Sequence, residues 1–125
     1  MNVLEFAREK NVRKVIFPST REIYGKVEGT DRIKETLFNM LHNELADCLF
    51  IDLFSGSGGI GIEALSRGAK KAYFVDNSPK AYSCIQENLL FTKLADKSII
   101  LRQDAVTALT SIYEKEVDII FMDPP

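Results

Sequence analysis

Hydrophobic residues recur along this chain at two spacings, one typical of helices and the other of strands. Helical spacing is clearest after Thr30, where apolar residues return every four positions at Ile33, Leu37, Leu41 and Leu45. Helices are predicted at 2–11, from about Thr30, at 60–67, from Ser78 and at about 105–113. Apolar runs predict buried strands at 14–19, 49–53, 72–75, 98–101 and 117–122. This alternation favours an α/β sandwich with helices on both faces of a parallel sheet.

Several residues mark the ends of these elements. Thr30 or Asp31 can cap the helix that they begin, and Ser78 followed by Pro79 is a strong helix start. Gly68 fits a left-handed helix stop, and Pro18 lies near a strand end, where a missing amide donor is tolerated. The predicted elements are therefore separated by short connections.

Length and composition narrow the class of protein. With 125 residues, 27% of them charged, the sequence predicts a single domain, residues 1–125, and neither a membrane span nor a disordered chain. Residues 1–14 lack the apolar core of a secretory signal and the chain has two cysteines, so we expect a cytoplasmic protein without a disulfide framework. The single histidine, His42, has no ligand-type neighbour at a suitable spacing, and no metal site is predicted.

Charge divides the chain near Gly29. Residues 1–28 carry six basic and four acidic side chains, whereas residues 29–125 carry ten against fourteen, for a total net charge of −2. The basic side chains are scattered and form no cluster of the kind that grips nucleic acid unaided. We therefore expect modest affinity for nucleic acid and a change of character between residues 1–28 and the rest.

The most informative stretch is Asp52-Leu-Phe-Ser-Gly-Ser-Gly-Gly-Ile-Gly61, placed where a strand ends and a helix begins. Its glycines allow backbone angles closed to other residues and let a ligand approach the main chain, next to unpaired helix amides. A tight turn without a ligand is the structural alternative. The glycine density favours a ligand-binding loop.

Two ligands fit this loop. Gly56, Gly58 and Gly61 spell the dinucleotide fingerprint G-x-G-x-x-G, with Asp76 about twenty residues downstream, so NAD stays an alternative. Asp52, however, is suited to a cationic amino group, which a pyrophosphate does not present. Asp76 and Asp104 follow successive strands, where they can hold ribose hydroxyls and read an adenine edge, or simply cap helices.

The last residues, Phe121-Met-Asp-Pro-Pro125, form a second signal. An acid and two prolines at the end of an apolar strand make a stiff corner that presents a carboxylate and backbone carbonyls. Such acceptors can bond the hydrogens of an exocyclic amine and orient its lone pair toward a methyl donor. A simple strand terminator is the alternative.

Together these motifs resemble those of a known protein family. From Thr30 to Pro125 the chain resembles the bacterial small-subunit ribosomal RNA guanine-N2 methyltransferases, on the runs Asp31-Arg-Ile-Lys-Glu-Thr-Leu-Phe-Asn-Met-Leu41, Asp52-Leu-Phe-Ser-Gly-Ser-Gly58, Glu63-Ala-Leu-Ser-Arg-Gly-Ala69 and Asp123-Pro-Pro125. The resemblance implies a three-layer Rossmann-like fold with a doubly wound parallel sheet, S-adenosylmethionine as cofactor and RNA as partner. It also implies strands and an aromatic residue beyond Pro125, which this sequence does not contain.

The resemblance also implies a role for each motif residue. Asp52, Ser55, Gly56 and Gly58 would follow the methionine part of the cofactor, Asp76 would hold the ribose, and Asp104 would face the adenine. The expected cofactor residues are Asp52, Ser55, Gly56, Ser57, Gly58, Asp76, Asn77, Asp104 and Ala105. The expected catalytic residues, which orient the target amine, are Asp123, Pro124 and Pro125.

Residues 1–25 resemble a different family, the helix and strand of NAD-dependent sugar-nucleotide epimerases and dehydratases. Ser19 or Thr20 matches the catalytic hydroxyl of that strand, but Tyr24 is followed by Gly25 and Lys26, which breaks the Tyr-x-x-x-Lys spacing of those enzymes. This motivates the hypothesis of an engineered or recombined chimera with little turnover. A fold without a ligand and an NAD-binding domain are the alternatives.

The two parts suggest one sheet. We expect the strand at 14–19 to occupy the edge position beside the strand at 117–122, which gives a permuted order with the first strand of the sequence at the edge. Without it the last strand would be a bare apolar edge prone to aggregation. The hypothesis requires Val15 to Phe17 to pair with Ile119 to Phe121 and leaves a monomer or an edge-mediated dimer open.

Overall fold

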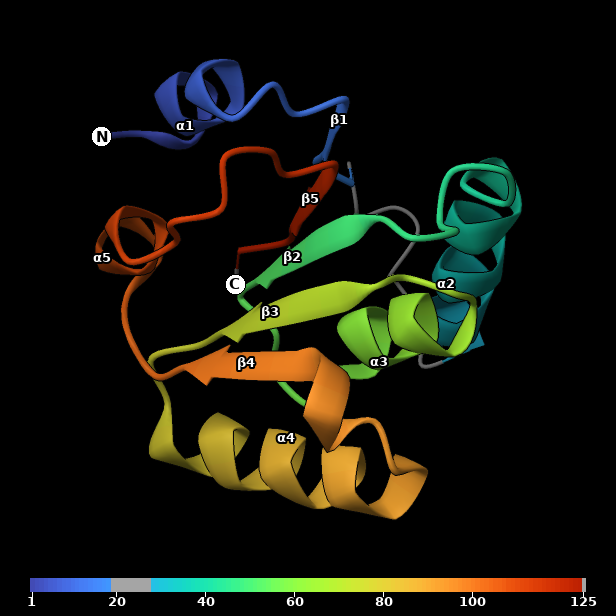
Figure 1. The fold of residues 1–125 in the computed structure, drawn as a ribbon. Coiled ribbons are helices and arrows are strands. Elements are labelled where there is room, and N and C mark those ends of the chain that lie inside the picture. Colours follow the sequence, from blue (N-terminus) through green and yellow to red (C-terminus); the bar gives the residue numbers. More distant parts are fainter. Residues whose placement is uncertain (19–27, 125) are drawn as a thin grey trace.

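The computed structural model describes residues 1–18 and 28–124, with the side chains of 28–33 outside the description. Helices and strands alternate along the chain (Figure 1). The helices are α1 (Val3–Glu9), α2 (Glu28–Met40), α3 (Gly59–Ser66), α4 (Pro79–Thr92), the 3₁₀ turn η1 (Ala95–Lys97) and α5 (Ala105–Thr110). The strands are β1 (Lys14–Ile16), β2 (Leu49–Leu53), β3 (Lys71–Val75), β4 (Ser98–Leu101) and β5 (Ile119–Met122).

All five strands form one parallel sheet in the order β1-β5-β2-β3-β4. β1 pairs with β5, with Val15 opposite Ile120 and Ile16 opposite Phe121. The sheet runs from β1 to β4, with β5 between β1 and β2 (Figure 1). This confirms the predicted permuted order and the edge position of the first strand. The ladder covers Lys14 to Ile16, so Phe17 of the predicted Val15 to Phe17 pairing lies beyond it.

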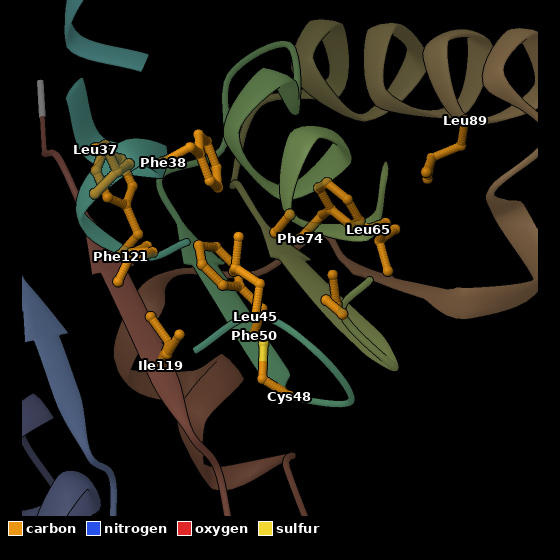
Figure 2. Packing of buried hydrophobic residues seen from close by; sticks show 14 of the residues in the cluster. Leu37, Phe38, Leu45, Cys48, Phe50, Leu65, Phe74, Leu89, Ile119 and Phe121 are labelled. Atoms are coloured by element: carbon orange, nitrogen blue, oxygen red, sulfur yellow. The ribbon is translucent and has the colours of Figure 1, made fainter. Parts of the chain in front are cut away.

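The sheet separates two apolar layers. On one face α2, α3 and α4 cover β-strand residues such as Phe50 and Phe74, and side chains from these helices pack around them (Figure 2). On the other face α1 and α5 cover Ile51 and Ile120, with Phe6 of α1 completely buried. Helices on both faces explain why every residue of β2 is buried, and they confirm the doubly wound Rossmann-like α/β fold.

The N-terminal helix and strand are joined to the sheet by main-chain bonds as well as by packing. Arg13 N–H donates to the Asp118 carbonyl at 3.0 Å, and Val117 N–H donates to the Lys10 carbonyl at 3.2 Å. The Lys10 ammonium donates to the Glu114 carbonyl at 2.7 Å, which fastens the end of α1 to the loop before β5. Residues 3–16 are therefore an integral edge of the sheet.

Capping and turn residues in the sequence correctly predicted the ends of some helices. The Ser78 hydroxyl accepts from Ala81 N–H and caps α4, and Gly68 takes a φ of +111°, as predicted. Several elements are shorter than expected: α1 ends at Glu9, β1 at Ile16, α2 at Met40 and α5 at Thr110, and β5 begins at Ile119. Helix α2 begins at Glu28, so Thr30 and Asp31 lie inside it and the predicted helix start at these residues is wrong. Leu37, Leu41 and Leu45 are buried as expected. The Ile33 side chain and the epimerase-type residues Ser19, Thr20 and Tyr24 lie outside the description.

Candidate functional site: an acidic cavity at the carboxyl edge of the sheet

The carboxyl ends of β2, β3, β4 and β5 meet at one edge of the sheet, where ligands bind in open parallel sheets. A cavity of about 610 Å³ opens there, within the size range of small-molecule sites. Its walls come from the residues that follow these four strands: Phe54, Gly56, Val75, Asp76, Asn77, Ser78, Gln103, Asp104, Ala105 and Asp123. The topology thus brings together motifs that lie far apart in the sequence.

The glycine-rich loop between β2 and α3 reverses direction through three left-handed residues. Phe54, Gly56 and Gly58 have φ values of +60°, +58° and +83°. Ser55 holds the loop to both strands beneath it, since its hydroxyl donates to the Asp52 carbonyl at 2.6 Å and accepts from Val75 N–H at 3.1 Å. The loop is therefore a fixed surface, and at Phe54 it uses a backbone conformation that is uncommon outside glycine.

Asp76 joins the loop to the next helix. One carboxylate oxygen accepts from Gly56 N–H and the other from Ser78 N–H, both at 2.9 Å. Each carboxylate oxygen has two lone pairs, so acceptor capacity is left for hydroxyl groups of a ligand in the cavity. Asp76 is half-buried, and two amides fix its orientation. The carboxylate can therefore accept further hydrogen bonds from a ligand in the cavity.

Asp104 caps α5. Its carboxylate accepts from Thr107 N–H at 2.9 Å and from the Thr107 hydroxyl at 2.8 Å, and the Thr107 N–H is the main reason that the pKa of this exposed acid is lowered. The helix-cap alternative is therefore the observed role of the carboxylate. Asp104 and Ala105 nevertheless lie in the wall of the cavity, on the side away from the glycine-rich loop.

Among the side chains that the structure describes, Asp52 is the one buried charged or polar group of the core, with 1% of its surface exposed. Its carboxylate accepts from Gly61 N–H, in the first turn of α3, at 3.0 Å. Burial raises its pKa to about 7, a rise that this hydrogen bond opposes and that the nearby charges of Asp76 and Asp123 reinforce. Asp52 is absent from the cavity wall and lies beneath the loop.

The Asp-Pro-Pro corner reaches the cavity from β5. Asp123 is half-buried and forms part of the wall, and Pro124 is exposed beside it. Pro125 lies outside the described residues. Asp123 of the corner therefore lines the same opening as the glycine-rich loop and Asp76.

The electrostatic character of the cavity is acidic. Among the described residues its lining holds three carboxylates, from Asp76, Asp104 and Asp123, and no lysine or arginine. A second hollow of about 330 Å³ shares Gly56 and Asp76 with the first and includes the ammonium-bearing Lys80. The main cavity suits a ligand with cationic and hydroxyl groups and disfavours a doubly charged pyrophosphate.

The predicted residues divide into two groups. Gly56, Asp76, Asn77, Asp104, Ala105 and Asp123 line the cavity, whereas Asp52, Ser55, Ser57 and Gly58 do not. Ser57 lies on the second hollow. Sequence reasoning missed Phe54, Gln103 and Ser78 as lining residues, although each one directly precedes or follows a predicted site residue and carries a side chain able to stack or hydrogen-bond.

Metal ligands and membrane-spanning helices bear on the class of site. In the part of the chain that the structure describes, no three His, Cys, Asp or Glu side chains are grouped as metal ligands would be. Within residues 1–18 and 28–124, no helix is both long and apolar enough to cross a bilayer.

Comparison with known proteins places this site in context. Residues 27–125 match a family model described as "Conserved hypothetical protein 95". The YlbH protein of Bacillus subtilis is 42% identical over 98 residues, which cover 77% of this chain and 53% of that protein. Ribosomal RNA small subunit methyltransferase D of Haemophilus influenzae is 35% identical over 97 residues, 76% of this chain and 50% of that protein. The chain spans about half the length of these curated relatives.

A solved structure gives the same picture. The yhhF protein of Escherichia coli superposes with a TM-score of 0.68 and 35% identity, covering 76% of this chain and 52% of its own. The part matched by the family model, residues 27–125, contains the glycine-rich loop and all the strand ends that line the cavity.

Proposed function

Because this chain belongs to the family described as Conserved hypothetical protein 95, whose matched relatives include a ribosomal RNA small subunit methyltransferase, we propose that it is the S-adenosylmethionine-binding part of a ribosomal RNA guanine-N2 methyltransferase. The observation that carries the proposal is the acidic cavity at the carboxyl edge of the sheet. Its three carboxylates match a ligand that carries an ammonium, a sulfonium and a ribose diol.

Each part of S-adenosylmethionine is assigned to residues that follow a different strand. We assign the ribose hydroxyls to Asp76, whose carboxylate is already oriented by two amides. The adenine edge is assigned to Asp104 and Ala105, by their backbone groups, since the Asp104 carboxylate caps α5. The methionine part is assigned to the glycine-rich loop from Ser55 to Gly58, with Asn77 beside the ribose.

Asp123 and Pro124 would act on the second reactant. S-adenosylmethionine supplies a methyl group on a positively charged sulfur when bound. The Asp123 carboxylate and the Pro124 carbonyl would accept the two hydrogens of a guanine N2 amine, which aims the nitrogen lone pair at that methyl. In the reaction this nitrogen would bond to the methyl carbon while the C–S bond breaks and leaves its electron pair on sulfur, and the methylated amine would then lose a proton to water.

The proposal is tested by calorimetric titration of the chain with S-adenosylhomocysteine and, in parallel, with NAD. We expect binding of the former only, and Asp76→Asn should weaken it about tenfold through loss of one charged acceptor. Asn39→Ala, at an exposed position on α2 outside the cavity wall, is the control. Binding of NAD alone would favour the dinucleotide alternative, and binding of neither would favour a fold without a ligand.

The origin of residues 1–28 is a separate proposal. We propose that this helix and strand derive from another α/β protein, as in a recombined or engineered chimera, and that the chain acts as a cytoplasmic protein on RNA. Two observations support a join near Gly29: the charge balance changes there, and the family match begins at residue 27. A sequence search with residues 1–25 alone should then retrieve epimerases and dehydratases, and retrieval of methyltransferases instead would contradict it.

A further inference from the structure

The first turn of α3 lacks the usual local cap. Its N-cap residue is Gly58, which has no side chain to accept the helix amides, and no side-chain bond caps the helix from that position. A capping side chain normally accepts from the second or third amide of the helix. Here the third residue of the helix, Gly61, donates instead to the Asp52 carboxylate, which comes from β2.

Gly61 is also fixed by packing. A Cβ placed there would lie 2.4 Å from a ring carbon of Phe74, so the first turn of α3 lies against β3 with no room for a side chain. On its other end the loop is held by Asp76, which accepts from Gly56 N–H. The loop is thus held between two carboxylates, of which only Asp76 lies on the cavity wall.

We propose that Asp52 is a positioning residue: its buried carboxylate shapes the glycine-rich loop by capping α3 at Gly61, and it does not contact the ligand. This inference deepens the proposed function and rests on it. It assigns the recognition of the amino-acid part of the ligand to the loop backbone and the exposed cavity wall, whose amides Asp52 sets in place.

Two observations favour a cap over a direct charge contact. Asp52 is 1% exposed and its carboxylate already accepts from a helix amide, so a ligand ammonium would have to displace part of the loop to reach it. Capping needs an acceptor and no net charge, because asparagine caps helices about as well as aspartate. Removal of the charge alone should therefore leave the loop intact.

The test compares two ligands that differ only in the amino-acid part. S-adenosylhomocysteine and 5′-methylthioadenosine are titrated into the wild-type chain, Asp52→Asn and Asp52→Ala, at a temperature where circular dichroism shows all three folded. We expect Asp52→Asn to keep both affinities within about threefold of wild type. Asp52→Ala leaves the Gly61 amide without its acceptor and should weaken S-adenosylhomocysteine about tenfold. It should weaken 5′-methylthioadenosine less, because that ligand lacks the amino-acid part that the loop binds. The matched control is Leu45→Ala, a core truncation at the opposite edge of the sheet, which should leave both affinities unchanged.

The outcomes separate the possibilities. A loss of S-adenosylhomocysteine binding in Asp52→Asn, with 5′-methylthioadenosine unaffected, would mean direct contact with the ligand ammonium and would overturn the inference alone. If Asp52→Ala fails to fold, the Gly61 amide resonance of Asp52→Asn decides, since the inference requires that it stay hydrogen-bonded. A wild-type chain that binds neither nucleoside would overturn the proposed function and this inference with it.

Discussion

The α1–β1 unit and the β2–loop–α3 unit are both parts of the same sheet, yet they are held in different ways. α1 and β1 contribute one fully buried side chain, Phe6, and a short ladder to β5. The β2–α3 unit combines a fully buried strand with a buried acid, left-handed residues in its loop and a glycine pressed against an aromatic ring. The α1–β1 unit therefore requires only that its sequence form an apolar helix and a strand of suitable length.

The difference teaches which parts of such a fold are interchangeable. An edge strand needs backbone pairing and one buried face, requirements that many helix–strand pairs meet. The glycine-rich unit needs a particular residue at several positions at once, because a change at Asp52, Gly58 or Gly61 meets a specific neighbour. We therefore expect damage to the first unit to lower stability alone, and damage to the second to affect ligand binding as well.

The largest expected effect is that of Phe6→Ala. Removing this fully buried ring should lower the free energy of unfolding by about 4 kcal/mol, measured by urea denaturation. The affinity of the folded protein for S-adenosylhomocysteine should not change. Leu4→Ala, on the same helix but 75% exposed, is the control and should change stability by less than about 0.5 kcal/mol. A large affinity loss in Phe6→Ala would remove the contrast between the two units.

Gly61→Ala should be nearly as damaging. The new methyl would meet the Phe74 ring at 2.4 Å, and such overpacking should lower the free energy of unfolding by about 3 kcal/mol and weaken S-adenosylhomocysteine binding. Gly56→Ala has no atom within 4 Å of the added carbon and should cost only about 1 kcal/mol, from its left-handed backbone. Equal stability of the two variants in urea denaturation would contradict the packing argument.

Asp52→Asn should change how stability depends on pH. The pKa of Asp52 is about 7 in the folded chain against 3.8 for an ordinary aspartate, so its contribution is fully present below pH 4 and lost as the pH rises to 7. Asparagine does not ionise, so the variant does not lose this stability as the pH rises. The unfolding free energy of the variant relative to wild type should therefore rise by about 2 kcal/mol between pH 5 and pH 8. A constant difference across that range would show that Asp52 is not the titrating group.

The smallest effect concerns the bonds that join the two units. The Asp118 carboxylate accepts from Leu49 N–H at 2.7 Å and pairs with Arg13 at 3.4 Å. Asp118→Ala should cost about 1 kcal/mol in thermal or urea unfolding, because it leaves the Leu49 amide without its acceptor. Arg13→Ala removes an exposed ion pair and a long, exposed hydrogen bond to the Glu44 carbonyl, and it should cost about 0.5 kcal/mol or less. The reverse order would mean that the ion pair holds β1 in place.

Much of the fold could be predicted because its signals are local. The apolar runs identified all five strands, and the position of β1 followed from the need to cover the apolar edge of β5. Some predicted elements are longer than the observed ones, because a pattern of apolar residues does not show at which residue the hydrogen bonds between strands end. Phe17 belongs to the apolar run at 14–19, yet it lies beyond β1 and is 61% exposed.

The candidate site could be predicted only in part. Asp76 and Asp123 were placed correctly because residues that follow parallel strands must meet at one edge. The burial of Asp52 could not be foreseen, since its partner is a backbone amide nine residues away that no sequence pattern marks. The left-handed φ of Phe54 likewise depends on how Ser55 is tied to both strands, which is a tertiary contact.

The pairing of β1 with β5 also sets the order of events during synthesis. β1 precedes every other strand and lies beside β5, the last strand, so its ladder cannot form until residue 121 has left the ribosome. Contacts between such distant segments raise the contact order and slow folding. Until then the apolar face of α1 around Phe6 and the open side of β2 are both uncovered on the nascent chain. We therefore expect chaperones to bind the nascent chain mainly between the synthesis of β2 and the emergence of β5.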